Sequence, residues 1–228
     1  MVKVLCLPKP IWAVLFILIQ ILNFSLIIAT IAHDYWFHQK WEVGDSSGKY
    51  KGYLVWPKTG ISGICNHSGD SFKYCHDECE DLYDDLNMNT GICDRFKYWY
   101  SAGVAYLFFS IIACVFTVLI VIVLLVDICK CGCLKKIFNI YTTGFLMIFV
   151  FILHFLAFTI WAGTVELKFD SCSHDADYKG RKSVCGEGGA AMALFLLFWF
   201  LFITPIHFIV ARKLRMKELE EDGNGLLN

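Results

Sequence analysis

Four long apolar runs constrain the fold of this chain more than any other feature of its sequence. They cover residues 11–32, 101–126, 142–161 and 190–211, and none of them contains Lys, Arg, Asp or Glu. An α-helix needs about 20 residues to cross the ~30 Å hydrocarbon core of a bilayer, because it rises ~1.5 Å per residue. A soluble helix of this length normally carries a polar stripe. The sequence therefore predicts four transmembrane helices, and its mean hydropathy of +0.55 agrees.

Clusters of basic residues lie before the first apolar run, between the second and third runs, and after the fourth. Loops with an excess of Lys and Arg normally stay in the cytoplasm. The chain is therefore expected to be one membrane domain, residues 1–228, with both termini inside and a cytoplasmic tail at 212–228. Loops 33–100 and 164–189 are expected outside, and the first run is interpreted as a retained signal anchor. The basic residues that carry this prediction are Lys3, Lys9, Lys130, Lys135, Lys136, Arg212, Lys213, Arg215 and Lys217.

Six of the eleven cysteines fall in the two predicted outer loops. An even number of cysteines in an oxidising compartment indicates disulfide bonds. Their close spacing favours the pairs Cys65–Cys75, Cys79–Cys93 and Cys172–Cys185, and a bond between the two loops is the alternative. Asn66, directly beside Cys65, begins an Asn-His-Ser sequon and is a candidate glycosylation site.

Three further cysteines, Cys129, Cys131 and Cys133, lie among lysines at the predicted inner end of the second run. Juxtamembrane cysteines in basic surroundings suit S-palmitoylation, which adds apolar anchoring at the interface. Reduced thiols and a metal site are the alternatives. Alternate cysteines are cramped for tetrahedral coordination, and neither a His nor a fourth Cys lies in this short loop.

The first outer loop combines strand-like and helix-like patterns. Residues 49–56 alternate in part as a strand does, after a turn at 45–48. A second hairpin is predicted from 60–66 and 71–75, turning at 68–70. Residues 76–88 have the period of a short amphipathic helix with an acidic face, which either is simply solvated or attracts cations. These patterns predict a small disulfide-stapled sheet with one short helix.

The sequence around Gly60, Ile61 and Cys65, followed by Cys75, resembles the first-loop motif of the claudin and peripheral myelin protein superfamily. That motif reads Gly-Leu-Trp, two residues, Cys, then a second Cys eight to ten residues later. Trp36 matches the Trp that this family has just outside its first span. The small residues 188–191 resemble its entry to the fourth span. The chain departs from the family at Ile61, at Ser62 in place of Trp, in its four additional outer-loop cysteines and in its C-terminal residues.

The resemblance implies a mainly α membrane fold: a left-handed four-helix transmembrane bundle that carries a small extracellular β-sheet and a short helix. It also implies a plasma-membrane protein that forms cell contacts or barriers through its outer loops. The alternatives are an auxiliary subunit that packs against a channel, like the family's calcium-channel γ relatives, and a connexin-type pore. The expected partners are the lipid bilayer and other membrane proteins, including further copies of the chain in cis or in trans.

The sequence contains no catalytic, nucleotide-binding or metalloprotease motif, so we predict no enzymatic activity, cofactor, metal or nucleic-acid partner. The loop tips at 68–70 and 175–182 are the preferred contact residues. Within the apolar runs, His154 either bonds a neighbouring helix or serves as a proton relay or ligand site. Gly103 and Gly144 are predicted to permit close helix approach.

Overall fold

The computed structural model describes residues 3–4, 7–33, 35–43, 46–55, 71–85, 93–129, 139–169 and 184–225. The chain divides into two compact units. The first, which we call the span unit, contains residues 1–28, 110–155 and 195–228. The second, which we call the sheet unit, contains residues 29–109 and 156–194.

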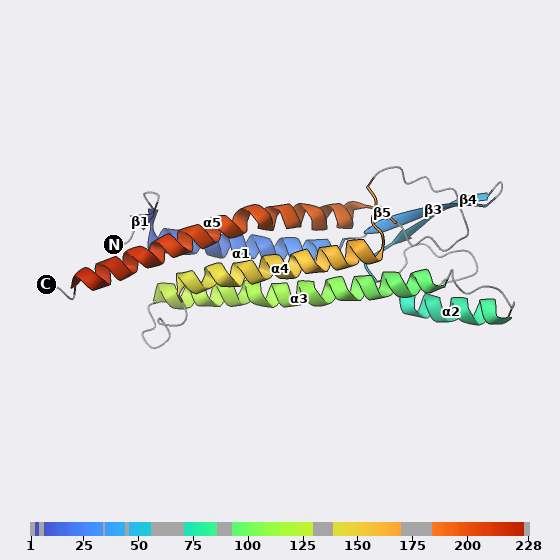
Figure 1. Cartoon of the computed structure of the whole chain (residues 1–228), viewed down its shortest axis with the longest axis horizontal. Helices are drawn as coiled ribbons and strands as arrows, with labels where there is room; N and C mark the ends of the chain where they lie inside the picture. Colours follow the sequence, from blue (N-terminus) through green and yellow to red (C-terminus); the bar gives the residue numbers. More distant parts are fainter. Residues whose placement is uncertain are drawn as a thin grey trace. The chain divides into compact units, whose positions relative to one another are not determined.

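All four predicted spans are helices, drawn as α1, α3, α4 and α5 in Figure 1. Their bounds are Lys9–Ile31 for α1, Asp94–Cys129 for α3, Ile140–Thr164 for α4 and Gly188–Gly225 for α5. Each is long and apolar enough to cross a membrane, which indicates a multi-pass membrane protein.

The helices exceed the apolar runs at several ends. The predicted outer loop is therefore too long at its C-terminal end, because residues 94–100 form the first turns of α3. Helical hydrogen bonds are made within the segment, so a helix continues beyond its apolar run wherever side chains support it. Phe96 and Trp99 give this support, since both are buried.

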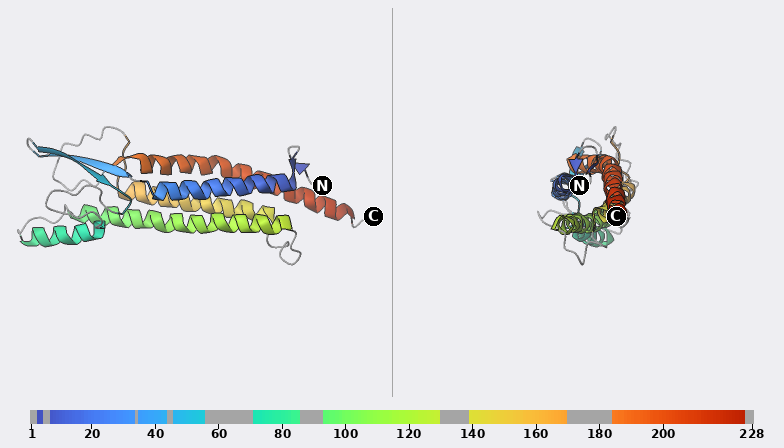
Figure 2. Two further views of the ribbon diagram at one scale, coloured as in Figure 1. Left: turned by 180° about the vertical axis from the view of Figure 1, so that it is seen from behind. Right: turned by 90° about the vertical axis from the view of Figure 1, so that its left-hand side faces the viewer.

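In the span unit the four helices pack against one another. Phe116 of α3 stacks on Phe149 of α4, with ring centroids 6.0 Å apart. Gly144 of α4 confirms its predicted role, because a Cβ there would lie 3.1 Å from the ring of Phe208 on α5. The apolar side chains on the outer faces of these helices remain exposed, as expected for residues that meet lipid. Figure 2 gives two further views of these helices.

The sheet unit holds a three-stranded antiparallel sheet in the order β4-β3-β5. Strands β3 (Phe37–Val43) and β4 (Ser46–Gly52) form a hairpin, and the short β5 (Cys185–Gly186) pairs with the start of β3. The prediction of a strand at 49–56 is correct in its first half only. Residues 46–48, predicted as part of a turn, belong to β4, because β3 supplies a partner strand that the local pattern did not reveal.

Helix α2 (Phe72–Asp85) corrects the second predicted hairpin. Residues 71–75 were expected to form its second strand, but the helix begins at Phe72 and includes Cys75. The buried stripe is Phe72, Cys75 and Cys79, spaced at i, i+3 and i+7, so helical periodicity starts earlier than predicted. The other half of that hairpin, 60–66, lies outside the described residues.

A second small sheet in the span unit was not predicted. Strands β1 (Lys3–Val4) and β2 (Leu7–Pro8) pair antiparallel just before α1. The indole Nε1 of Trp12 donates a hydrogen bond to the carbonyl of Val4, at 2.9 Å. This bond and the burial of Val4 hold β1 against α1.

Candidate interaction platform and buried polar clusters

Trp36 is the centre of the sheet unit. Its side chain is fully buried, and its ring packs edge-on against Tyr106 of α3 and Trp161 of α4, with centroids 4.6 and 4.9 Å away. Its indole Nε1 donates to the carbonyl of Thr30 at 3.1 Å. Trp36 therefore connects the end of α1 to α3 and α4. The sequence showed only that a Trp occupies the position of the Trp in the claudin-type motif.

The backbone around Trp36 connects the remaining elements of the unit. The amide of Trp36 donates to the carbonyl of Gly52 in β4, and its carbonyl accepts from the amide of Glu187 at 2.9 Å. The amide of Gly189 in the first turn of α5 donates to the carbonyl of Tyr35 at 2.7 Å. The start of α5 and the sheet are thus fixed to the same short segment.

Two glycines make this packing possible. A Cβ on Gly189 would lie 2.7 Å from Cδ1 of Trp36, closer than side chains approach, so the indole fills the space that the missing side chain leaves. A Cβ on Gly103 would clash with the carbonyl oxygen of Leu54. Gly103 was predicted to permit close approach of a neighbouring helix. It instead permits close approach of the backbone at Leu54, which follows β4.

We call Trp36, the rings packed against it and the three-stranded sheet the platform. An aromatic cluster attaches helix α2 to this platform. Phe72 of α2 lies 5.6 Å from Trp99 and 6.3 Å from Phe96 of α3, and 5.9 Å from Phe37 of β3, measured between ring centroids. All four rings are fully or almost fully buried. Aromatic pairs at these distances contribute roughly 0.5–1.5 kcal/mol each beyond the area they bury, so α2 is firmly docked.

The disulfide Cys79–Cys93 confirms one predicted pair and joins α2 to the start of α3. Cys75 and Cys185 are also disulfide-bonded. Cys65 and Cys172 lie outside the described residues, so the pairs Cys65–Cys75 and Cys172–Cys185 stay predictions.

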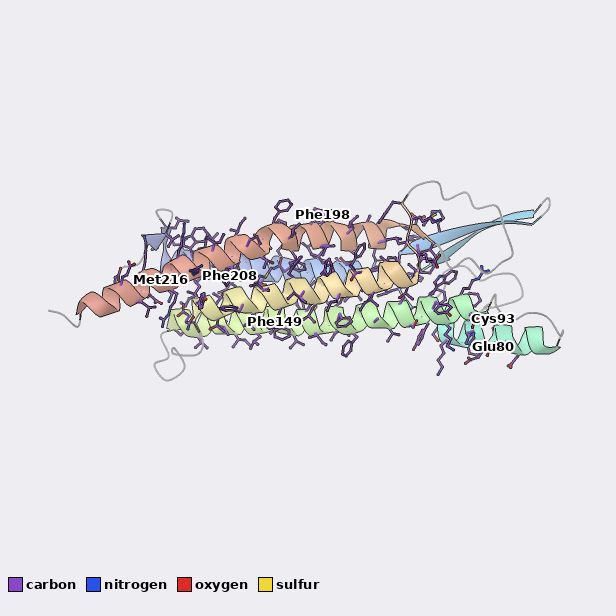
Figure 3. All side chains as sticks on the ribbon, viewed as in Figure 1. Glu80, Cys93, Phe149, Phe198, Phe208 and Met216 are labelled. Atoms are coloured by element: carbon purple, nitrogen blue, oxygen red, sulfur yellow. A yellow bond between two sulfur atoms is a disulfide. The ribbon has the colours of Figure 1, made fainter. Side chains whose placement is uncertain are left out.

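The platform presents one face of α2 to solvent. Lys73, Tyr74, Asp77 and Asp81 are exposed on it, which agrees with the predicted acidic face. Glu80, labelled in Figure 3 beside Cys93, lies 3.4 Å from the Nε2 atom of His76. In the sheet, Nδ1 of His38 lies 2.7 Å from a carboxylate oxygen of Glu187, an ion pair when His38 is protonated.

The span unit contains a cluster of buried amide side chains that connects three helices. The side-chain nitrogen of Asn23 donates to Oε1 of Gln20 at 3.2 Å, and Nε1 of Trp199 donates to Oδ1 of Asn23 at 2.8 Å. Nε2 of Gln20 lies 3.4 Å from the sulfur of Met147. Helices α1, α4 and α5 are therefore linked at this level by polar contacts that lipid cannot replace.

The two intramembrane histidines occupy separate places in the same unit. His207 stacks on Phe16 with ring centroids 3.8 Å apart, and its Nε2 lies 2.9 Å from the hydroxyl of Thr143. His154 packs edge-on against Phe200 at 5.4 Å. His207 therefore links α5 to α1 and α4, and His154 of α4 contacts α5.

A charged cluster at one end of the span unit was missed by sequence reasoning. Nζ of Lys9 lies 2.8 Å from a carboxylate oxygen of Asp127 and 2.6 Å from one of Glu218, which also lies 3.3 Å from Arg215. The cluster joins α1, α3 and α5. Charged residues at the ends of three apolar runs were the available indication, but nothing in the sequence showed that they meet.

Several predicted site residues lie outside the described residues. They are Gly60, Ile61, Cys65, Asn66, Cys131, Cys133 and Cys172, with the loop tips at 68–70 and 175–182. Cys129 is described, and it is a free, exposed thiol at the end of α3. Among the described residues no group of three or more His, Cys, Asp or Glu side chains is arranged to hold a metal ion.

Comparison with known proteins adds no family assignment. No family model matches the chain, and no curated protein or solved structure matches it.

Proposed function

We propose that this chain is a non-catalytic, claudin-like membrane protein that forms cell contacts or barriers through the loops of its sheet unit. In this proposal the helices form the left-handed bundle of that family, both termini are cytoplasmic, and the protein resides in the plasma membrane. The sheet unit then faces the outside, where its cysteines oxidise and Asn66 is available for glycosylation.

The observation that carries the proposal is the Trp36-centred platform. The resemblance rests on few positions, and two of them, Trp36 and the small residues that open α5, meet directly at Gly189. A fully buried Trp, an aromatic cluster and the Cys79–Cys93 disulfide make a rigid base for the segments between its elements. Binding to a rigid surface loses less conformational entropy than binding to a flexible one, which suits a contact protein.

The test is cell aggregation with variants of the exposed face of α2. Asp77→Asn with Asp81→Asn removes two acidic groups from that face, and the matched control Glu220→Gln with Glu221→Gln removes two from the tail. We expect the α2 variant to change aggregation or partner capture at unchanged surface expression, and the tail variant to leave both unchanged.

A second experiment exchanges both loop tips, 68–70 and 175–182, for Gly/Ser segments of equal length. If aggregation and partner capture persist at normal surface expression in both experiments, contact through the outer loops is wrong. Substrate turnover by the purified protein would overturn the non-catalytic assignment.

The auxiliary-subunit alternative is favoured by a row of exposed aromatic side chains on α5. Phe195, Phe198 and Phe202 are spaced at i, i+3 and i+7 and are 59%, 52% and 68% exposed. Figure 3 shows Phe198 projecting from the outer side of α5 and Phe149 on α4. If this row packs against a larger complex, changing the three residues to Leu weakens co-purification without affecting membrane insertion, whereas Phe149→Leu has no effect. Equal effects of both variants would leave lipid contact as the role of the row.

A further inference from the structure

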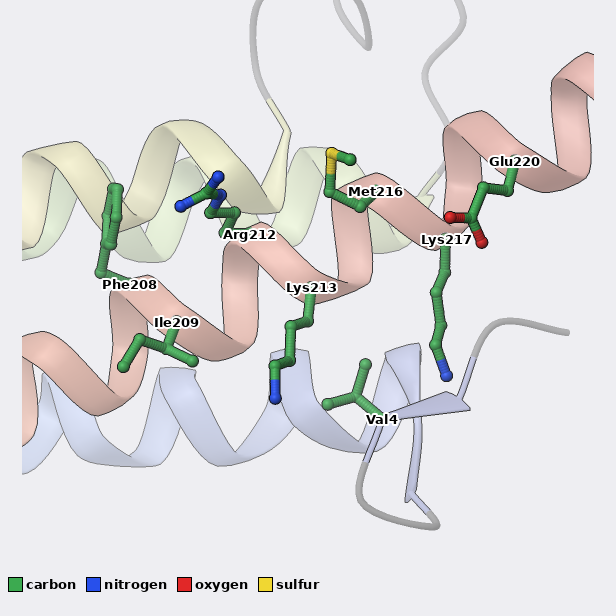
Figure 4. A pocket seen from close by; sticks show the side chains of 8 residues that line it. All are labelled: Val4, Phe208, Ile209, Arg212, Lys213, Met216, Lys217 and Glu220. Atoms are coloured by element: carbon green, nitrogen blue, oxygen red, sulfur yellow. The ribbon is translucent and has the colours of Figure 1, made fainter.

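A groove at the end of the apolar part of α5 has the features of a lipid-binding site. It has a volume of about 570 Å³ and lies between α5 and strand β1 of the span unit. Val4 forms one wall, fixed in place by its burial and by the hydrogen bond from Trp12. The other wall is α5 itself, at the point where its apolar run ends (Figure 4).

Two adjacent rows of side chains on α5 line this wall, each at spacing i, i+4 and i+8. The first row is Phe208, Arg212 and Met216, and the second is Ile209, Lys213 and Lys217. Figure 4 shows the second row on the side of α5 that bears toward Val4. Each row begins with an apolar residue in the predicted span and reaches a cation one turn later. This is the order of an acyl chain followed by a phosphate along a phospholipid in the membrane.

The charges of the groove favour an anion. Arg212, Lys213 and Lys217 face it with a single acidic residue, Glu220. The nearby carboxylate of Glu218 is engaged by Lys9 and Arg215. Within the described part of the chain, no ion pair involves Arg212 or Lys213. The guanidinium of Arg212 and the ammonium of Lys213 together suit a phosphate, since Arg donates in a planar fork and Lys adds a point charge.

We propose that this groove binds one anionic glycerophospholipid of the surrounding leaflet. Arg212 and Lys213 hold the phosphate, and Phe208, Ile209 and Val4 contact the upper part of an acyl chain. The proposal does not depend on the contact function. It requires only that α5 leaves the bilayer near Arg212, where the uncharged run ends.

Native mass spectrometry of the full-length protein in mild detergent tests the site. The probes are dioleoyl phosphatidylserine, neutral dioleoyl phosphatidylcholine, and the soluble headgroup glycerophosphoserine. We expect selective retention of phosphatidylserine over phosphatidylcholine, and no competition by glycerophosphoserine. Arg212→Gln with Lys213→Gln should weaken phosphatidylserine binding on the order of tenfold at low ionic strength, because each cation near the headgroup contributes to the attraction.

Two controls keep the outcome decisive. Lys73→Gln with Lys97→Gln removes the same charge from exposed residues outside the groove and should leave binding within about twofold of the parent protein. Arg212→Lys with Lys213→Arg keeps the charge and should retain selectivity even if the neutral variant fails to fold.

Equal binding of both lipids by the parent protein would overturn the proposal. An equal loss of binding in the Lys73/Lys97 control would show that only net charge matters, and would also overturn the proposal. Competition by glycerophosphoserine as strong as by the lipid would show an anion site without an acyl-chain contact, which would refute the lipid assignment.

Discussion

Substituting Gly189 by alanine tests the packing at Trp36 with a single methyl group. The new Cβ would lie 2.7–2.8 Å from Cδ1, Cγ and Nε1 of the indole, and an aromatic ring cannot yield as the end of a flexible side chain can. The ring has no room to move, because Tyr106, Trp161 and the hydrogen bond to Thr30 hold its other sides. Overpacking of this kind costs roughly 1–3 kcal/mol.

Alanine also has the higher helix propensity, by up to about 1 kcal/mol, which offsets part of this cost. A net loss of roughly 1–2 kcal/mol is therefore expected, which for a chain of this size lowers the unfolding midpoint by roughly 2–8 °C. The assay is thermal unfolding of the purified protein in detergent at a fixed heating rate, because membrane proteins often unfold irreversibly.

Gly163 of α4 supplies the matched control. No atom lies within 4 Å of a Cβ placed there, so Gly163→Ala should leave the midpoint unchanged or raise it. Trp36→Phe shortens the ring, so its combination with Gly189→Ala should cost less than the sum of the two single variants. A midpoint for Gly189→Ala at or above that of the parent, or strict additivity in the double variant, would refute the proposed packing.

Three further predictions concern a disulfide of the sheet unit, an ion pair of the span unit and the thiol of Cys129. Replacing Cys79 and Cys93 together by Ser should destabilise the sheet unit by about 3 kcal/mol, from the loop that the bond closes, and a lower unfolding midpoint with unchanged membrane insertion checks this. Lys9→Met should lower the free energy of unfolding by about 3–5 kcal/mol, because it leaves the buried Asp127 unpaired. Adding Asp127→Leu should restore part of the lost unfolding midpoint, and a double variant with no restoration would contradict the ion pair. Cys129→Ser should reduce acyl-biotin exchange labelling of protein from cells, and labelling unchanged in this variant would leave Cys129 as a free thiol.

Short-range patterns predicted part of the sheet unit correctly. The acidic amphipathic helix and the pair Cys79–Cys93 follow from local spacing, which a helix or a short loop preserves. The second hairpin failed because residues 71–75 are few and helix and strand periods are hard to separate over such a length. The hairpin β3–β4 was only half predicted, since the register of β4 depends on a strand that begins outside its own segment.

The candidate sites were visible in the sequence only as separate residues. Trp36 and Gly189 were both noted, yet their direct contact joins positions far apart in the chain. The triad of Lys9, Asp127 and Glu218 is likewise assembled from the ends of three helices. Residue spacing carries no information about such contacts, because which helix faces meet depends on how whole segments pack.

The sequence by itself determined the number and places of the four helices, because crossing a bilayer requires an uninterrupted apolar run of nearly fixed length. It also favoured the local disulfide Cys79–Cys93 before α3, which the structure contains. Only the tertiary structure decided that Trp36 is the centre of the sheet unit, that α2 docks through Phe72, and that β1 and α5 enclose a groove with a cationic rim. These features depend on contacts between residues distant in the chain, and such contacts exist only once the helices have packed.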